Sequence, residues 1–284
     1  MIFGLVAALG WGVADFAGAV SARRLGSLWV VLVAQTASAI VVTGIILAGG
    51  HDAGLVGSAL GLLAINGAFS AAAYVTHYRA LELGPVAVVS PVGATYALVG
   101  VLLATLLLHE RPSALTITGG LITIAGVMLT STDLAKVFSG MHRMPPGLPW
   151  AVASACGFGV GGYTLAKLSQ DLGWELGLWG SRCSQLIAFA AVGLLWRRRE
   201  LRGRFLAGPA WLAAVTVGGS DLLGVVAFSI GAERGFVTPV LIASAVFPLI
   251  AVLLSVVYLH ERPVANQYAG VVLTVVGLAT VGLA

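Results

Sequence analysis

Charge is scarce in this sequence. Only 9% of its 284 residues are Asp, Glu, Lys or Arg, whereas a soluble globular domain carries about 25%. Hydrophobic residues make up 59% of the chain, and the mean hydropathy is +1.01. A soluble core of this chain length does not bury so much apolar surface. The composition therefore excludes an ordinary soluble domain and indicates an integral membrane protein with the lipid bilayer as its partner.

Several functional motifs are also absent. The two cysteines, Cys156 and Cys183, lie in apolar stretches and give neither a disulfide framework nor a metal site. The chain has no Gly-x-x-x-x-Gly-Lys-[Ser/Thr] motif for ATP and no His-Glu-x-x-His motif for zinc. The net charge of +4 comes with no basic run outside one loop, so no nucleic-acid partner is expected. We accordingly expect no enzyme activity, no catalytic residues, no metal and no cofactor.

Long runs without charge are what the sequence has instead. Seven of them exceed the roughly 18 residues expected of a membrane helix, and these are 25–51, 53–78, 83–109, 112–132, 144–166, 235–260 and 263–284. Three more apolar runs carry one charge each, namely Ile2–Val20 with Asp15, Leu176–Trp196 with Arg182, and Pro209–Ile230 with Asp221. Because lipid offers no partners to backbone polar groups, helices are the expected form. The predicted fold is an all-α integral membrane protein with ten transmembrane helices.

The two halves of the chain are similar in sequence. Residues 84–126 align with 235–277 without a gap, and 17 of the 43 aligned positions are identical, including a His-Glu-Arg-Pro sequence in each half. Five helices per half is an odd number, so the second half enters the membrane from the opposite side. Such inverted repeats are typical of secondary transporters that work by alternating access. The predicted units are a first five-helix repeat over 1–131, a linker over 132–147 and a second five-helix repeat over 148–284.

An ordered set of short motifs runs through both halves. It comprises Trp11-Gly12, Ala80-Leu81 followed by Gly84, the turns Glu110-Arg111 and Glu261-Arg262, and Pro248. With this set, nearly the whole chain resembles the EamA-type family of the drug/metabolite transporter superfamily. The resemblance implies a ten-helix exporter or exchanger of amino acids, metabolites, drugs or nucleotide-linked sugars. Two features depart from it: the 49–53 loop lacks Lys and Arg, and Ala97 aligns with Pro248 while Pro91 comes earlier, so we expect the helix kinks of the two halves at different positions.

Charge also predicts the orientation of the chain. The loops of one face hold 11 Lys and Arg residues and those of the other hold 3. The positive-inside rule then predicts that both termini lie outside the cell. The family resemblance implies the reverse, with both termini inside, and the two interpretations remain open.

Charged side chains at membrane depth are costly and mark candidate functional positions. Arg182 aligns with Gln35 and Asp221 aligns with Ser70, so equivalent helices carry polar groups at matching depths. Such pairs are typical of a central cavity. The alternative is a structural ion pair of Arg182 with Asp15 or Asp221. Asp15 lies near the end of its predicted span, where it also reaches the membrane interface.

Polar and aromatic residues at similar depth complete the predicted site. One helix carries a polar stripe that ends at His77, which we expect at the interface; transfer of a coupling proton is the alternative role. For each aromatic residue the alternative is packing in the core. The predicted substrate-binding residues are Trp11, Asp15, Gln35, Asn66, Ser70, Tyr74, Ser90, Tyr96, Tyr163, Arg182, Asp221 and Phe247.

The repeated turns and the glycines favour structural roles. Glu110 and Glu261 each precede a proline close to the start of the next helix, where a carboxylate is favourable. Glycines four residues apart allow helices to approach closely, within the chain or in a homodimer; they are Gly57 and Gly61, Gly157 and Gly161, and Gly173 and Gly177. The predicted function is a secondary transporter of a small metabolite, amino acid or drug-like solute in the cell membrane. A membrane-embedded enzyme and a non-transporting receptor or assembly factor are the alternatives.

Overall fold

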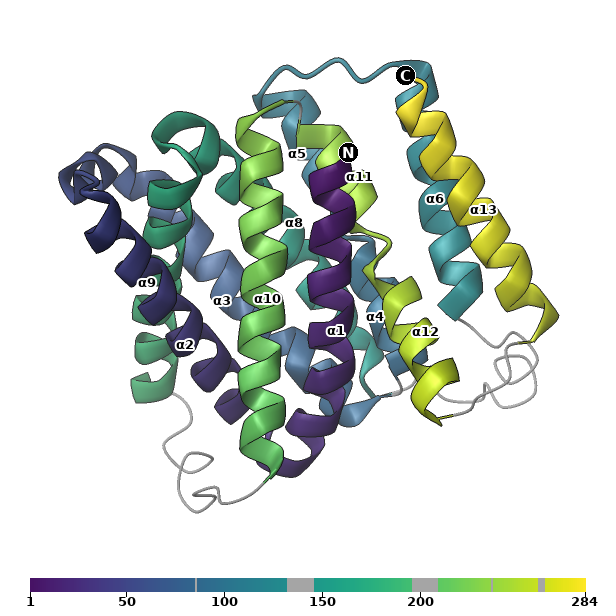
Figure 1. The fold of residues 1–284 in the computed structure, drawn as a ribbon, viewed down its shortest axis with the longest axis horizontal. Helices are drawn as coiled ribbons and strands as arrows, with labels where there is room; N and C mark the ends of the chain where they lie inside the picture. Colours follow the sequence, from purple (N-terminus) through teal and green to yellow (C-terminus); the bar gives the residue numbers. More distant parts are fainter. Residues whose placement is uncertain (85, 132–145, 196–208, 236, 260–263) are drawn as a thin grey trace.

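The computed structural model describes residues 1–84, 86–131, 146–195, 209–235, 237–259 and 264–284, which form helices and no strand (Figure 1). The first half contains α1 (Ile2–Leu25), α2 (Ser27–Gly49), the short 3-10 helix η1 (Ala53–Ala59), α3 (Leu60–Leu83), α4 (Val86–Ala94), α5 (Tyr96–Leu107) and α6 (Ala114–Ser131). The second half contains α8 (Leu148–Leu172), α9 (Trp174–Leu195), α10 (Pro209–Glu233), α11 (Val237–Ser244), α12 (Phe247–Leu259) and α13 (Ala265–Gly282). The predicted all-α class is confirmed over the described residues.

Apolar helices dominate the bundle. Six helical stretches are long and apolar enough to cross a membrane, and these are Ile2–Leu25, Ser27–Gly49, Ala53–Leu83, Val89–Leu107, Ala214–Glu233 and Ala265–Gly282. Large apolar side chains such as Ile40, Leu102 and Leu212 are exposed, as expected where lipid replaces water. The two termini lie at the same end of the bundle (Figure 1). The chain is therefore a membrane protein with several apolar helices.

A glycine ends the first helix of each half in the same conformation. Gly26 follows α1 with φ 85° and ψ 145°, and Gly173 follows α8 with φ 83° and ψ 155°. Glycine adopts a positive φ at little cost because it has no Cβ. The two glycines are 147 residues apart, the same offset that aligns Gln35 with Arg182. Each half therefore begins with two helices joined by the same one-residue turn.

Two helices are broken at equivalent positions. The break between α4 and α5 lies at Thr95, and the break between α11 and α12 includes Val246, which is 151 residues later. The same backbone hydrogen bond occurs at both breaks. The N–H of Leu98 donates to the carbonyl of Thr95 at 3.0 Å, and the N–H of Leu249 donates to the carbonyl of Val246 at 2.9 Å. The expectation that the kinks differ was therefore wrong. Pro248 lies in the first turn of α12, where the missing N–H has no intrahelical partner to lose, and Pro91 lies inside α4 rather than at its end.

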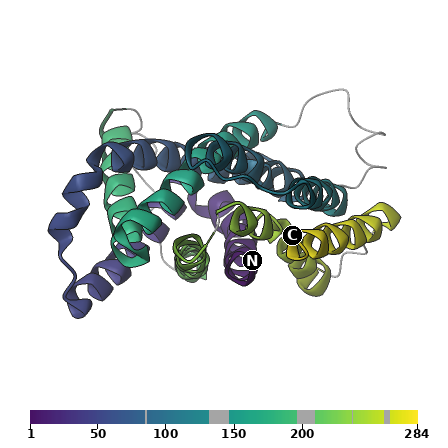
Figure 2. The same ribbon diagram turned by 90° about the horizontal axis from the view of Figure 1, so that it is seen from above.

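Helices of one half pack mainly against helices of the other. α1 packs against α10 and α3 against α8, while α2 packs against α9 and α6 against α13. In the two halves α1 is equivalent to α8, and α3 to α10. The α1–α10 pair is therefore equivalent to the α8–α3 pair, whereas α2–α9 and α6–α13 each join two equivalent helices. The α6–α13 pair lies at one edge of the bundle (Figures 1 and 2). This arrangement leaves α1, α3, α8 and α10 around the centre.

Glycine permits the close approach of α6 and α13. A methyl group added at Gly126 would lie 2.5 Å from the backbone nitrogen of Thr274, and one added at Gly277 would lie 2.5 Å from that of Thr123. The two contacts are equivalent, because Gly126 aligns with Gly277 and Thr123 with Thr274 at the 151-residue offset. Of the glycine pairs expected to bring helices together, Gly157 and Gly161 contact α3 closely, Gly177 contacts Leu168, and Gly57 and Gly61 have nothing within 4 Å of an added methyl group.

Candidate functional site

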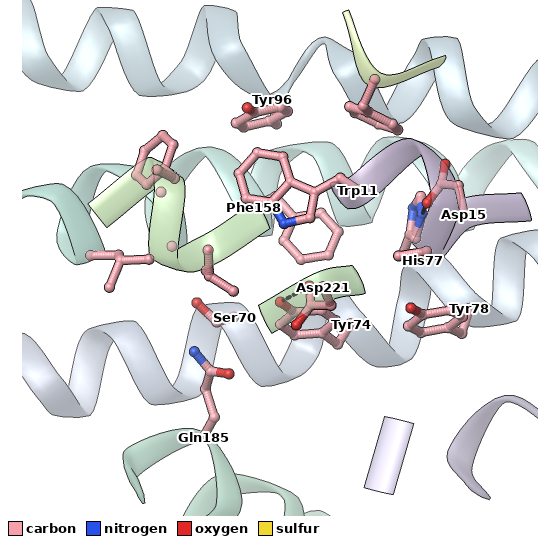
Figure 3. Close-up of a pocket in the computed structure, with 18 of the residues that line it drawn as sticks. Trp11, Asp15, Ser70, Tyr74, His77, Tyr78, Tyr96, Phe158, Gln185 and Asp221 are labelled. Carbon is pink, nitrogen blue, oxygen red and sulfur yellow. Dashed lines mark hydrogen bonds and ion pairs between the residues drawn. The ribbon is translucent and has the colours of Figure 1, made fainter. Parts of the chain in front are cut away.

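A cavity of about 90 Å³ lies in the centre of the bundle, between helices from both halves (Figure 3). A single buried water needs about 10–15 Å³, so the cavity has room for a small solute. Nine predicted site residues line it: Trp11, Asp15, Asn66, Ser70, Tyr74, Tyr96, Arg182, Asp221 and Phe247. The other three do not. Gln35 and Ser90 bond to charged lining residues from behind, and Tyr163 is buried outside the lining.

Arg182 and Asp221 form an ion pair at one wall of the cavity. Nη2 of Arg182 lies 2.8 Å from Oδ2 of Asp221, and both residues are nearly fully buried, at 1% and 3% exposure. Tyr74 donates its hydroxyl to the other carboxylate oxygen at 2.9 Å. Gln35, which aligns with Arg182 in the sequence comparison of the two halves, contacts it here. Its side chain accepts from Arg182 and donates to Asp221 at 3.4 Å. The structural ion pair considered from sequence is thus present, and it also forms part of the cavity wall.

Asn66 joins three helices rather than presenting a free amide. Its Nδ2 donates to the carbonyl of Gly161 at 3.0 Å and to the Thr164 hydroxyl at 2.8 Å, both on α8. Its Oδ1 accepts from the Ser181 hydroxyl on α9 at 2.7 Å. Because the amide is already bonded on both sides, Asn66 fixes α3 between α8 and α9.

A second polar cluster contains Asp15, His77 and Ser90. Oδ1 of Asp15 lies 2.8 Å from Nε2 of His77, and the Ser90 hydroxyl donates to Oδ2 at 2.5 Å. Figure 3 shows Asp15 and His77 together, apart from Asp221 and Gln185. Asp15 thus lies at the cavity, as predicted, and the alternative interface position is not seen. The expectation that His77 lies at the interface was wrong: α3 continues to Leu83, and His77 is 5% exposed.

Aromatic rings separate the two polar clusters. Trp11 contacts Tyr96 edge-on at 6.1 Å between ring centroids and lies 5.7 Å from Phe228. Phe158 makes edge contacts with Tyr74 on one side and with His77 on the other, at 5.0 and 5.5 Å. The Tyr96 hydroxyl bonds to Ser244 beside the break in the α11–α12 helix. The cavity therefore offers ring faces and edges to a solute, and both polar clusters contribute to its lining.

Eleven of the twenty lining residues were absent from the predicted site, and Gln185, Tyr78 and Phe228 are among them. Gln185 accepts from Arg182 at 3.0 Å and follows it by three residues on one face of α9, and Tyr78 follows Tyr74 by four on α3. Helical spacing from a charged or aromatic candidate was thus a usable signal for both. Phe228 has no such signal, because its position depends on the packing of α10 against α1.

Glu110 lies outside the cavity and stabilises the start of a helix in the other half. Its carboxylate accepts from the backbone N–H groups of Val237 and Thr238 at 2.6 and 3.1 Å, and from the Thr238 hydroxyl at 2.6 Å. The helix concerned is α11 and not α6, which directly follows the turn. The structural role predicted for Glu110 is therefore supported, but the helix that it stabilises is α11 and not the one expected. Glu261 lies outside the described residues.

Ser154 is not positioned as a catalytic nucleophile. Asp15, His77 and Ser154 follow one another in the order of a hydrolytic triad, with Nδ1 of His77 3.5 Å from the Ser154 hydroxyl. Ser154, however, is fully buried outside the cavity lining and donates to the Ala151 carbonyl at 2.8 Å. An attacking oxygen must be free to contact a substrate. Among the described residues, no group of three or more His, Cys, Asp or Glu side chains could hold a metal ion.

Comparison with known proteins agrees with this architecture. The model of the EamA-like transporter family matches residues 1–132 and 145–283. A solved structure described only as "Crystal structure of protein" is 23% identical, with a TM-score of 0.77 over 99% of this chain and 96% of the other. At that identity the likeness concerns the fold alone. No curated protein matches the chain.

Proposed function

We propose that this chain, which belongs to the EamA-like transporter family of the drug/metabolite transporter superfamily, is a secondary transporter of a small solute. The observation that carries the proposal is the central cavity, lined by side chains from both halves of an apolar helical bundle. A solute in it contacts α1 and α3 of one half and α8 and α10 of the other. Families of this kind are generally transporters, and we propose no enzymatic activity.

Alternating access is the mechanism we propose, by ten transmembrane helices in two inverted five-helix repeats. Three observations support it: the reciprocal α1–α10 and α3–α8 packing, the helix breaks at equivalent positions, and the Gly26 and Gly173 turns. Two similar halves that pack across a central site can expose that site to either side by rocking. The proposed location is the cell membrane, and export or exchange is the proposed direction.

The proposed substrate is a small metabolite, amino acid or drug-like molecule with an apolar or aromatic part. Arg182 and Asp221 already neutralise each other, so that wall attracts no net charge. The rings of Trp11, Phe158 and Phe228 also line the cavity. Such rings bury apolar surface and favour offset-stacked or edge-to-face contact with another ring.

A ligand screen followed by flux measurement tests the proposal. Purified protein is screened against a metabolite library by thermal shift, and each hit is assayed for flux in proteoliposomes. Gly162→Leu is the test variant, because an added Cβ there meets the cavity rings of Tyr96 and Phe228 at the ordinary distances of 3.8 and 3.9 Å. Gly219→Leu is the matched control, since nothing lies within 4 Å of its added Cβ and Gly219 is exposed.

We expect Gly162→Leu to fold, to lose the thermal shift and to lower flux at least about tenfold, which corresponds to about 1.4 kcal/mol. Gly219→Leu should keep both. Full flux through Gly162→Leu would show that the solute does not pass through this cavity. A well-folded protein that moves none of its ligands would contradict the transport proposal itself.

A further inference from the structure

The imidazole of His77 has an oxygen atom near each of its two nitrogens. Nε2 lies 2.8 Å from Oδ1 of Asp15, and Nδ1 lies 3.5 Å from the hydroxyl oxygen of Ser154. The single proton of that hydroxyl is donated to the carbonyl of Ala151 at 2.8 Å. The lone pairs of the Ser154 oxygen are therefore available to an N–H on the Nδ1 side. The surroundings suit an imidazolium, which donates from both nitrogens.

Asp15 is held as the anionic partner of that imidazolium. One carboxylate oxygen faces His77, and the other accepts from the Ser90 hydroxyl at 2.5 Å. Both Asp15 and His77 line the cavity, so a proton can reach the pair from any water that enters it. The pair is thus buried in the bundle yet connected to the proposed substrate path.

We propose that Asp15 and His77 form the site of a coupling proton, which binds to Nδ1 of His77. This inference rests on the proposed transport function. In the loaded state the imidazolium and the carboxylate have no net charge. Loss of this proton from the imidazolium to water in the cavity leaves a neutral imidazole beside an anionic carboxylate, with a net charge of −1.

The charge difference couples the proton to the state of the cavity. A net charge in a low-dielectric site at membrane depth is unfavourable without water or a counter-charge. The pair therefore releases its proton only when the cavity admits water or receives a cationic group of the solute. With the cavity closed and empty, the loaded pair is the more stable form.

The other acid of the cavity does not suit this role. Asp221 is paired with Arg182, and a guanidinium does not lose its proton in a protein. Tyr74 and Gln35 add further donors to the same carboxylate. A histidine, in contrast, changes charge between pH 5 and 8 when unperturbed. Of the two acids, Asp15 is the one whose partner can gain and lose a proton.

The groups around His77 are otherwise neutral or already paired. α3 contributes Tyr78, whose ring centre lies 5.8 Å from that of the imidazole, and Tyr74 one turn earlier. α4 contributes the Ser90 hydroxyl, and α8 contributes Ser154 and the Phe158 ring. The nearest charges on α9 and α10 are Arg182 and Asp221, which pair with each other. Asp15 of α1 is thus the one unneutralised charge that faces the imidazole among the described residues.

Nitrogen-15 NMR of histidine-labelled protein in nanodiscs tests the proton site without a known substrate. The chain has five histidines, and the His77 signal is the one lost in His77→Gln. We expect the wild type at about pH 6 to show the imidazolium pattern for His77, and Asp15→Asn to show the neutral pattern at the same pH. His51→Gln is the control and should leave the His77 signal unchanged. A neutral His77 throughout a titration down to about pH 4, or an imidazolium that persists in Asp15→Asn, would refute the proposal.

Coupling is then measured as proton movement. Proteoliposomes loaded with a pH-sensitive dye are exposed to any transported hit from the ligand screen. We expect that hit to drive proton movement in the wild type and in His51→Gln, and at least about tenfold less in His77→Gln. Flux that ignores the pH gradient in the wild type would reject the coupling and leave the transport proposal intact. Absence of any flux would reject transport, while the NMR titration would still decide whether the pair binds a proton.

Discussion

The guanidinium of Arg182 in α9 lies 2.8 Å from the carboxylate of Asp221 in α10, with both side chains almost completely buried. Each charge depends on the other, because neither has water to solvate it. Removal of one partner leaves an uncompensated charge inside the bundle, which is much less favourable than removal of both. The pair is therefore structural, even though it faces the cavity.

A single and a double variant separate the cost of one uncompensated charge from the cost of removing the whole ion pair. Asp221→Asn should lower the free energy of unfolding by about 3–5 kcal/mol, read as a large drop in melting temperature in detergent. The double variant Arg182→Gln with Asp221→Asn should recover a substantial part of that loss, since no isolated charge remains. Asp171→Asn, at a partly exposed ion pair with Lys167, should change stability by no more than about 0.5 kcal/mol. If the double variant is less stable than Asp221→Asn, the pair is not held by mutual neutralisation.

Glu110 should be required for the stability of α11. Its buried carboxylate accepts from two backbone N–H groups and one hydroxyl at the start of that helix. Glu110→Ala should cost about 1–3 kcal/mol, because the three donors lose their partner in a buried place. Glu110→Gln keeps an acceptor oxygen and should cost less. Thermal unfolding followed by fluorescence measures both, with Glu82→Gln at a partly exposed ion pair as control. Equal stability of Glu110→Ala and wild type would contradict the assignment.

Substitution of glycine between α6 and α13 should separate the two helices. In Gly126→Val the Cβ alone would lie 2.5 Å from the Thr274 backbone nitrogen, and backbone cannot move aside as a flexible side chain does. We expect a loss of about 1–3 kcal/mol or more from overpacking, with lower yield of folded protein by size-exclusion chromatography. Gly44→Val has open space around its Cβ and should fold like the wild type. Equal yields from the two variants would show that the close packing is unimportant.

Ser154→Ala should weaken the proton-loaded state of His77. The substitution removes the oxygen that faces Nδ1 and keeps the Cβ, so the packing of α8 changes little. At about pH 6 the fraction of imidazolium in the nitrogen-15 spectrum should fall relative to the wild type. Ser184→Ala is a close match, because its hydroxyl also donates to the carbonyl three residues earlier, and it should have no effect. An unchanged imidazolium fraction in Ser154→Ala would exclude a contribution of Ser154 to the site.

Counting charge-free runs correctly predicted an all-helical chain with several apolar helices, but it did not predict where the helices end. Arg23 and Arg24 end the first apolar run, and Arg79 ends the third, yet α1 continues to Leu25 and α3 to Leu83. A long basic side chain can remain in a helix and extend toward the interface. The shortened spans placed Asp15 and His77 near helix ends, and for that reason their pairing at the cavity was not foreseen.

The burial of Arg182 and Asp221 inside the bundle was predictable, because each is a single charge in an otherwise apolar run. Which acid pairs with Arg182 was not, since Asp15 and Asp221 were equal candidates from sequence. The packing of α10 beside α9 and of α1 beside α3 decides it. The partner of Glu110 depended in the same way on contact between the turn after α5 and α11, which no local pattern encodes.

The interface between α6 and α13 is complementary to itself. Thr274 lies close to Gly126, and Thr123 lies equally close to Gly277. Thr130 likewise lies close to Gly270, and Val281 lies close to Gly119. The two contacts of each pair are related by the 151-residue offset between the halves. Paired contacts of this kind also occur in the interface of a two-fold symmetric homodimer. Each half of the chain thus carries both surfaces of the contact. A helix pair of this kind can therefore also form between two identical chains, so duplication and fusion of a half-length chain would preserve the contact.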